Sequence, residues 1–320
     1  MTTRTYRTFR NTDPPILVEL WRSRAGQIGF VQPVSCDLIE QLVFAKLYFD
    51  YGGLFLAFDD DRPVGFAHAG FGPNENQTWI SNETGVTCIV LVRPDCTEAN
   101  EVATGLLERC ESYLRDRGAE VLYGGATLLQ APFYLGLYGG CESPGVLDSD
   151  LLVQQLYSAR GYEAVDHMLL FQRDLNGFES LIDRQQMQIR RQMIVEVTND
   201  APTKTWWEAS ILGEFDLTRF ELVPRGGGAT IATALFRSMQ PSVTNAMGRS
   251  TGLIHFDVEP TYRRRGVANF LLSEAFRQFI RQGIMQVDTQ IPQSDEAALG
   301  AMQKLGFQQI ATGTVFRKAL

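Results

Sequence analysis

The feature that most limits how this chain can fold is an internal repeat, because one arrangement of segments occurs twice along its 320 residues. The matching segments are a strand ending in Val-x-Pro, a helix with two adjacent leucines and a shorter helix ending in Gly-aromatic: Val92-Arg93-Pro94 and Val258-Glu259-Pro260, Leu106-Leu107 and Leu271-Leu272, Gly161-Tyr162 and Gly306-Phe307. The shorter helix pattern begins at Asp150 and at Asp295, at the same distance from its glycine in both halves. A repeat this long and irregular indicates duplicated domains rather than a solenoid.

Hydrophobic periodicity, with glycine and proline as breaks, predicts a mixed α/β order in both halves. In the first half the expected strands cover residues 5–10, 54–58, 64–71, 85–92, 121–123 and 164–173, and the expected helices cover 36–49, 98–117, 151–160 and a segment opened by Asp13-Pro14. In the second half the expected strands cover 218–223, 229–237, 252–258, 285–290 and 307–317, and the expected helices cover 267–281 and 295–305. We place a linker near 176–188 and expect domains at 1–175 and 176–320.

The composition is that of an ordinary globular protein, with 44% hydrophobic and 21% charged residues. A net charge of −8, from 29 basic and 37 acidic residues, argues against a nucleic-acid partner. The five cysteines are odd in number and form no C-x-x-C pair, which favours reduced thiols in the cytoplasm. The N-terminus lacks the apolar segment of a secretory signal, so we expect a cytoplasmic location.

One segment requires a membrane test, because residues 121–141 contain no charged side chain and are nominally long enough to cross a bilayer. The segment carries repeated helix breakers: Gly124, Gly125, Pro132, Gly136, Gly139 and Gly140. No positive-inside bias flanks it. We therefore interpret it as a buried strand followed by an aromatic, glycine-rich loop, and we expect no membrane partner.

The strongest chemical signal is the loop Arg263–Ala268, which follows the strand ending at Pro260 and directly precedes the helix 267–281. A loop that enters a helix N-terminus exposes unpaired backbone N–H groups at the positive end of the helix dipole. Gly266 and Ala268 allow close approach to the backbone, and the three arginines add positive charge. The pattern predicts a binding site for a diphosphate, whereas a solvated basic turn is the alternative for the arginines alone.

With these residues in place, the sequence resembles the GNAT superfamily of acetyl-CoA-dependent N-acetyltransferases, whose signature at such a junction is R/Q-x-x-G-x-G/A. Arg263, Gly266 and Ala268 fill that signature, and a later family block is matched by Asp295, Ala298 and Gly306-Phe307. The resemblance implies two tandem GNAT-like domains, each with a mixed, mostly antiparallel twisted sheet flanked by helices. It also implies acetyl-CoA or another acyl-CoA as cosubstrate and direct acyl transfer to a small-molecule amine.

The resemblance further assigns the cofactor contacts. The backbone of the strand around Phe256 and Val258 would pair with the pantetheine arm, and Asp295 would belong to the same site. The diphosphate would contact the residues of the loop and the helix start: Arg263, Arg264, Arg265, Gly266, Val267 and Ala268.

The first half is expected to have lost this site. Alignment of the two halves places Glu101 at the position of Gly266 and Glu98 near that of Arg263, with Ala103 opposite Ala268. Acidic side chains there would repel a diphosphate. We therefore expect one cofactor site, in the second half, and a degenerate first half that is structural or forms a wall of the acceptor pocket.

Acyl transfer requires a proton acceptor for the amine and a proton donor for the leaving thiolate. Three candidate bases follow one another on one face of the strand that ends at Pro260, opposite Ile254, Phe256 and Val258: His255, Asp257 and Glu259. The tyrosine that serves as the family's acid is replaced by Met302, which cannot donate a proton. The first half keeps Tyr157 at the equivalent position, where core packing is the simpler interpretation.

Several alternatives stay open. Met302 favours, as a second hypothesis, a catalytically silent acyl-CoA sensor or scaffold. The loop 133–140 has no counterpart in the second half and could cover the acceptor site or seal an interface, and Trp206-Trp207 present the same choice. His68 and His167 lack partners at metal-ligand spacing, so no metal is expected. The duplicated halves could replace a dimer or help to form a homodimer.

Overall fold

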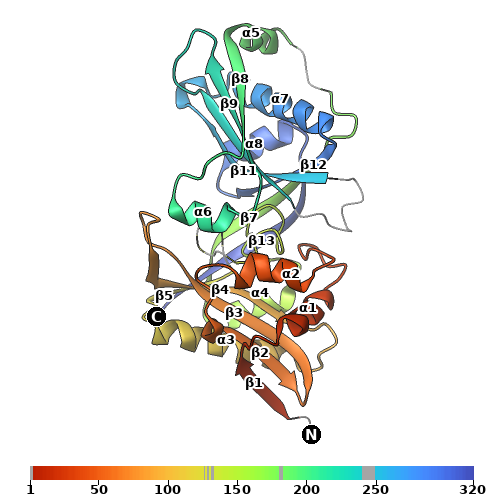
Figure 1. Ribbon diagram of the computed structural model, residues 1–320, viewed down its shortest axis with the longest axis vertical. Helices are drawn as coiled ribbons and strands as arrows, with labels where there is room; N and C mark the ends of the chain where they lie inside the picture. The colour runs from red at the N-terminus through yellow and green to blue at the C-terminus, as the bar shows by residue number, and fades with distance from the viewer. Residues whose placement is uncertain (1–2, 126, 128–129, 131–132, 180–182, 240–248) are drawn as a thin grey trace.

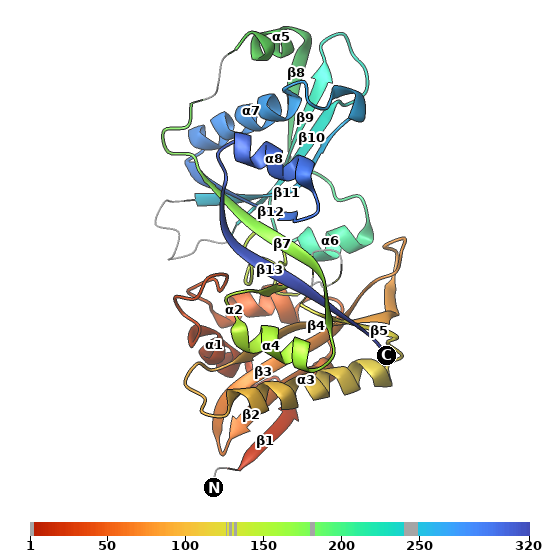
Figure 2. The same cartoon turned by 180° about the vertical axis from the view of Figure 1, so that it is seen from behind.

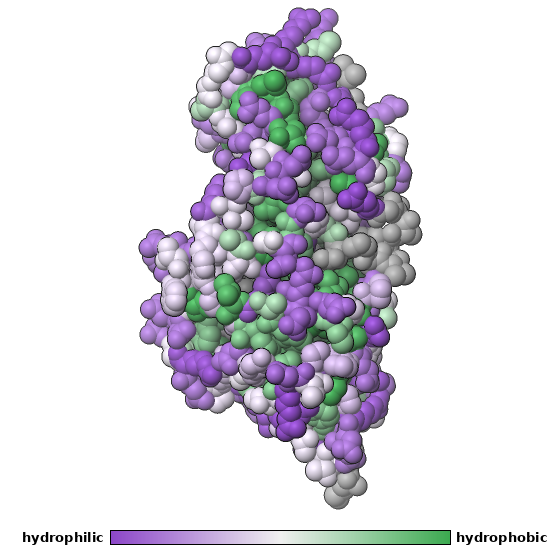
Figure 3. Space-filling view, in the orientation of Figure 1, coloured by the Kyte–Doolittle hydropathy of each residue, from purple (hydrophilic) through white to green (hydrophobic). Residues whose placement is uncertain are grey.

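The computed structural model describes residues 3–125, 127, 130, 133–179, 183–239 and 249–320. The first half of the chain builds the lower lobe in Figure 1, and most of the second half builds the upper lobe. The two lobes meet at a waist that long strands cross. Figure 3 shows hydrophilic side chains over most of the surface on this side, with apolar patches in the upper lobe and around the middle of the molecule.

The elements of the first half alternate as the periodicity predicts. Its strands are β1 (Arg4–Thr8), β2 (Leu54–Asp59), β3 (Arg62–Pro73), β4 (Ile80–Val92), β5 (Val121–Gly124), β6 (Val146–Leu147) and β7 (Glu163–Asp174). Its α-helices are α1 (Pro14–Arg22), α2 (Cys36–Ile39), α3 (Ala99–Asp116) and α4 (Leu151–Ala159), with a π-helical turn η1 (Glu40–Phe44) and a 3-10 turn η2 (Tyr51–Gly53).

The second half repeats this order behind an additional helix. Its strands are β8 (Met193–Asn199), β9 (Leu217–Pro224), β10 (Ala232–Ser238), β11 (Arg249–Val258), β12 (Ile284–Pro292) and β13 (Gln308–Ala319). Its helices are α5 (Arg184–Gln192), α6 (Trp206–Leu212), the 3-10 turn η3 (Pro260–Tyr262), α7 (Val267–Arg281) and α8 (Glu296–Lys304). In the described part of the chain, no helix combines the length and the apolar character needed to span a bilayer.

The two halves share one sheet, because their last strands are exchanged. The strand order is β1-β2-β3-β4-β5-β13-β7-β12-β11-β10-β9-β8 among the described residues. The C-terminal strand β13 pairs with β5 of the first half, and β7 pairs with β12 of the second half. Figure 2 shows β7 and β13 side by side between the lobes, with the C-terminus in the lower lobe near β5.

Most of the sheet is antiparallel, which confirms the predicted fold class. Only β4 with β5 and β11 with β12 are parallel pairs among the named strands. Each parallel pair is joined by a long helix, α3 or α7, as a crossover between parallel strands requires. The repeat seen in the sequence therefore corresponds to one structural unit used twice.

Three apolar clusters hold this architecture together. One lies between the lower sheet and α3 with α4, and a second lies between the upper sheet and α7 with α8. The third fills the waist, where Phe133, Tyr134 and Leu137 of the inserted loop meet Trp207 and Phe215 of the second half. The inserted loop and the tryptophan pair thus pack at the interface between the halves.

Four elements differ from expectation. The helix predicted for 36–49 ends as α2 at Ile39 and continues only as the π-helical turn η1, which ends at Phe44. Helix α5 begins inside the predicted linker and extends beyond it, and its single buried residue Ile189 gives too weak an apolar stripe to be recognised. The edge strand β8 and the seven-residue α6 were not predicted.

The exchange of strands predicts that a side chain near the C-terminus stabilises the N-terminal lobe. Phe316 of β13 is 3% exposed and stacks on Tyr157 of α4, with ring centroids 5.3 Å apart. Phe316→Ala should lower the free energy of unfolding by about 3–5 kcal/mol, measured by urea denaturation. Hydrogen exchange should show the protection lost at β5 and α4. The exposed neighbour Arg317→Ala is the control, and equal losses in both variants would contradict the packing.

Candidate functional site

Strands β11 and β12 diverge in the middle of the upper lobe. They pair in parallel from Arg249↔Ile284 to Leu253↔Thr289, after which β12 continues beside β7 and β11 beside β10. Beyond Leu253 the edge of β11 that faces β12 has no strand partner among the described residues. An extended ligand that lies in this opening can therefore take the place of a missing strand.

A β-bulge marks the point of divergence. Leu235 of β10 faces His255 and Phe236 faces Leu253, so Ile254 is the extra residue. The first half has the same construction, since β4 has an extra residue at Cys88, next to its last pair with β5. A bulge leaves one residue's backbone groups unpaired and aims them out of the ladder, which suits them to bind a carbonyl group.

The bulge corrects one expectation about the faces of β11. Strict alternation places Ile254 with Phe256 and Val258, but Ile254 packs against the waist cluster, whereas Phe256 and Val258 pack against the cluster beneath α7. The extra residue reverses the alternation at that point. His255 and Asp257 are exposed on the strand.

The loop after β11 has the geometry of an anion site. Arg264 and Gly266 adopt left-handed backbone conformations, with φ values of 58° and 73°, and Gly266 is the N-cap of α7. Such turns can form a concave nest of backbone N–H groups, and the first N–H groups of a helix have no intrahelical acceptor. Three exposed arginines surround this start: Arg263, Arg264 and Arg265.

The individual loop residues differ in what they contact. Arg263 folds back, donating from Nε to the Val258 carbonyl at 2.8 Å, with its guanidinium 3.5 Å from Asp257. Arg265 lies over the ring of Tyr262, 5.9 Å from its centroid. Val267 is buried beneath the helix, and Ala268 is half-buried. Arg264 is thus the loop arginine without such a contact among the described residues.

Helix α5 borders this loop, a neighbour that sequence reasoning missed. Gln186 donates from Nε2 to the Gly266 carbonyl at 3.2 Å, and a Cβ on Gly266 would lie 3.0 Å from Cδ of Gln185. An ion pair between Arg190 and Glu274 holds α5 against α7. Two carboxamide side chains therefore lie beside the helix start.

The three candidate bases differ in their hydrogen bonds, ion pairs and pKa shifts. The Glu259 carboxylate accepts from the backbone N–H of Thr261 at 2.9 Å and so caps η3. Asp257 pairs with Arg263. Partial desolvation of the ring, followed by the charge of Lys204, lowers the pKa of His255 below its ordinary value of 6.5, so its ring is neutral at pH 7. Of the three, His255 lies closest to the bulge and is ready to accept a proton.

Asp295 has a structural role in the helix start. It is the N-cap of α8 and accepts from the backbone N–H of Ala298 at 2.9 Å. This bond satisfies one of the orphan donors of the helix and fixes the chain directly after β12.

Neither residue at the position of the family's acid is accessible. Met302 is 1% exposed within the core beneath α7. Tyr157 is equally buried, lies between Tyr162 and Phe316, and has a pKa raised well above its usual value by burial. Tyr157 belongs to the divergence of β4 and β5 in its own half, where it lines a small cavity of about 10 Å³.

The first half is closed to a diphosphate at the equivalent helix start. When α3 and α7 are aligned at their C-caps, Arg117 and Gln282, Glu101 lies at the position of Gly266. Helix α3 already begins at Ala99, so one more helical turn replaces the open loop.

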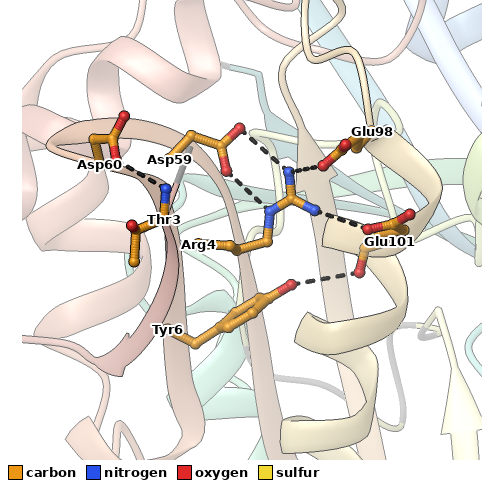
Figure 4. Close-up of polar contacts among 7 residues, drawn as sticks. All are labelled: Thr3, Arg4, Tyr6, Asp59, Asp60, Glu98 and Glu101. Atoms are coloured by element: carbon orange, nitrogen blue, oxygen red, sulfur yellow. Dashed lines mark hydrogen bonds and ion pairs between the residues drawn. The ribbon is translucent and has the colours of Figure 1, made fainter. Parts of the chain in front are cut away.

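Ion pairs occupy that place (Figure 4). Arg4 of β1 lies 2.7 Å from Glu98, 3.3 Å from Glu101 and 2.9 Å from Asp59. Tyr6 donates to the Glu101 carbonyl at 3.4 Å. The carboxylates that would repel a phosphate are thus satisfied within the protein.

Histidines do not form a metal centre in the described residues. His68 is fully buried, its Nδ1 lies 3.1 Å from the Tyr134 hydroxyl, and burial lowers its pKa to about 3. His167 lies 3.2 Å from the Thr314 hydroxyl on the neighbouring strand. No group of three His, Cys, Asp or Glu in the described ranges could hold a metal ion.

Comparison with known proteins agrees with this geometry. Residues 189–307 match the model of the acetyltransferase (GNAT) family. A comparison with curated protein sequences gives no match. Among solved structures, a tandem GNAT protein from the clavulanic acid biosynthesis pathway has a TM-score of 0.69 at 10% identity, and the alignment covers 99% of this chain and 98% of that one.

Two further structures have the same fold over almost the whole chain. A GCN5-related N-acetyltransferase from Sphaerobacter thermophilus has a TM-score of 0.64 at 14% identity, covering 99% of this chain and 95% of its own. A glucosamine N-acetyltransferase region of a fungal multi-domain β-N-acetylglucosaminidase has a TM-score of 0.70 at 17% identity, covering 99% of this chain and 38% of that one. Residues 189–307 therefore form a domain of the acetyltransferase (GNAT) family, within a chain that has the fold of a tandem GNAT protein.

Proposed function

We propose that this protein transfers an acyl group from acyl-CoA, in the simplest case acetyl-CoA, to a small-molecule amine at one site in its second half. The proposal rests on two structural features that lie side by side. The diverging strands with their bulge at Ile254 lie next to the left-handed loop that opens α7. An acyl-CoA needs both features, because its diphosphate and its thioester lie at opposite ends of the pantetheine arm.

Each part of the cosubstrate then has its own contacts. The diphosphate lies on the N–H groups of Gly266, Val267 and Ala268, with the charges of Arg264 and Arg265 beside it. The pantetheine amides pair with the free edge of β11 at Phe256 and Val258, and the thioester carbonyl lies at the bulge. Residues 176–320 form this acyl-CoA domain, and residues 1–175 form the domain without a cofactor site.

The amine approaches from the waist, where His255 accepts its proton. An aromatic wall stands on that side, since Trp206 of α6 stacks on Trp79, with centroids 6.4 Å apart, and meets Tyr48 at 5.0 Å. Glu208 also acts electrostatically on His255. A cation carried by the acceptor would find both an acidic group and aromatic faces there.

The buried Met302 favours a second candidate function, a catalytically silent acyl-CoA sensor. The two candidates differ in turnover. Release of free CoA thiol with a panel of amines is the expected outcome for the transferase, whereas acyl-CoA binding without thiol release would establish the sensor.

Charge reversal in the loop tests the cofactor site. Arg264→Glu should weaken acetyl-CoA binding at least tenfold, because a carboxylate would face the diphosphate. Arg281→Glu is the matched control, since it makes the same charge change at the other end of α7. Isothermal titration calorimetry should give one acetyl-CoA per chain for the wild type. Equal affinities in the two variants, or two sites per chain, would contradict the assignment.

The conformation of Gly266 provides a second test, with Gly283 as its matched control. Both glycines have φ near +74°, at 73° and 74°, but a Cβ on Gly283 meets nothing within 4 Å. Each Gly→Ala change should cost roughly 1–2 kcal/mol of stability from the left-handed backbone, measured by urea denaturation. Only Gly266→Ala should also weaken acetyl-CoA binding. Unchanged binding in that variant would place the diphosphate elsewhere.

The role of His255 predicts a pH dependence. The neutral ring is the active form, so kcat/KM should fall as the pH drops through the pKa of His255, which lies below 6.5. His255→Gln should lower kcat/KM by about 10²–10⁴ and abolish this acid limb. Asp257→Asn should retain the limb, because Asp257 is paired with Arg263. An acid limb that persists in His255→Gln would exclude His255 as the base.

A further inference from the structure

The inserted loop of the first half reaches the diverging strands of the second half. Arg237 of β10 donates from Nε to the Cys141 carbonyl at 2.6 Å and from Nη2 to the Gly140 carbonyl at 2.9 Å. Gln290 of β12 donates from Nε2 to the Gly139 carbonyl at 2.6 Å and to the Glu142 carbonyl at 2.8 Å. Two side chains on either side of β11 therefore hold the segment 139–142 in place.

This segment lies directly over β11, close to the bulge. Arg237, Gly252 and Asp288 are neighbours in register across β10, β11 and β12. Gly252 has no side chain, and a Cβ built there would lie 2.3 Å from Cβ of Cys141. The loop thus fits where the strand leaves room, two residues before Ile254. Gln290, its other anchor, is the first residue of β12 beyond the last pair with β11.

Glu142 is the carboxyl-bearing residue that the loop brings beside Arg237 and Gln290 at this opening. It is half-buried, and no described residue donates a hydrogen bond to its carboxyl group. Arg237 of β10 and Cys141 of its own loop interact with it electrostatically, and Asp288 of β12 interacts with the same Arg237. The carboxylate of Asp288, unlike that of Glu142, accepts hydrogen bonds from Gln286 at 2.9 Å and from Gln172 at 3.3 Å.

We propose that Glu142, contributed by the first half, is the general acid of the acyl-transfer site in the second half. The inference rests on the proposed function. The amine nitrogen attacks the thioester carbonyl carbon and forms the C–N bond, while His255 takes the proton that the amine loses. As the C–S bond breaks, its electron pair goes to sulfur, and sulfur takes the proton of the Glu142 carboxyl group. Solvent then returns a proton to Glu142 and removes one from His255.

The protonation states fit these roles. Burial raises the pKa of Glu142 to about 8, against the opposing effect of Arg237, so its carboxyl group is mostly protonated at pH 7. His255 is shifted in the opposite direction and is neutral. Two titratable groups whose environments push their pKa values apart are typical of an acid and base pair. Glu142 thereby supplies the proton that Met302 cannot donate to the leaving thiolate.

The pH profile of turnover tests the proposal. An acid must be protonated, so wild-type kcat should fall as the pH rises through about 8. Glu142→Gln should lower kcat by about 10²–10⁴ with KM for acetyl-CoA unchanged, and should lose the alkaline limb. Asp288→Asn, in the same cluster, and the exposed Glu120→Gln should both keep the limb. An unchanged kcat, or an alkaline limb that persists in Glu142→Gln, would overturn the proposal.

A direct titration separates this inference from the proposed function. In protein labelled with ¹³C at glutamate carboxyl carbons, the resonance absent from Glu142→Gln should titrate near pH 8 and shift when acetyl-CoA is added. A resonance that titrates like those of exposed glutamates, or whose chemical shift does not change when acetyl-CoA is added, would overturn the role of Glu142. This outcome does not depend on knowing the acceptor amine. Wild-type protein that binds acetyl-CoA but acylates no amine would instead contradict the proposed function, leaving the NMR result to decide on Glu142.

Discussion

The antiparallel pairing of β7 with β13 is the interaction on which the rest of this structure depends. Each of these strands leaves its own half to complete the sheet of the other, so the hydrogen-bond ladder runs without a break from β1 to β8. Two units that could have been separate domains therefore keep one fixed orientation. That orientation places the inserted loop of the first half against the opening between β11 and β12.

The same supersecondary unit serves two different purposes in the two halves. In the second half, a loop with left-handed residues leaves the start of α7 open to an anion. In the first half, an added turn of α3 and the ion pairs of Arg4 close that position. In that half, the ring of Tyr157 also packs against Tyr162 and Phe316 beside the divergence of β4 and β5. In the function proposed above, one copy of the unit binds the anion and the other copy serves as a support.

Local signals were sufficient for the repeat and for helix α7, whose range 267–281 was predicted to the residue. Its apolar stripe is strong, Gly266 directly precedes it, and Gly283 follows its C-cap Gln282. The bulge at Ile254 could not be predicted, because pairing with a distant strand decides where an extra residue is accommodated. The position of Glu142 was equally hidden, since only tertiary contacts bring a polar residue of a glycine-rich loop against Arg237 and Gln290.

Strand partners show the same limit of local reasoning. Both exchanged segments, 164–173 and 307–317, were predicted as strands. Neither segment indicates which sheet edge it joins, because backbone hydrogen bonds are alike for every sequence and do not select a partner strand. Register and partner follow from the buried faces, such as Phe316 on Tyr157. The loop Arg263–Ala268 was recognisable because its chemistry is contained in consecutive residues.

The exchanged strands also determine how the protein behaves when its backbone is cleaved. A cut between β7 and α5 would not release two modules, because one fragment would still hold β13 of the other between β5 and β7. The fragments would remain interlocked, as in a split protein whose pieces reassemble. Either half made alone would instead present a long unpaired strand edge, a template for association with other chains.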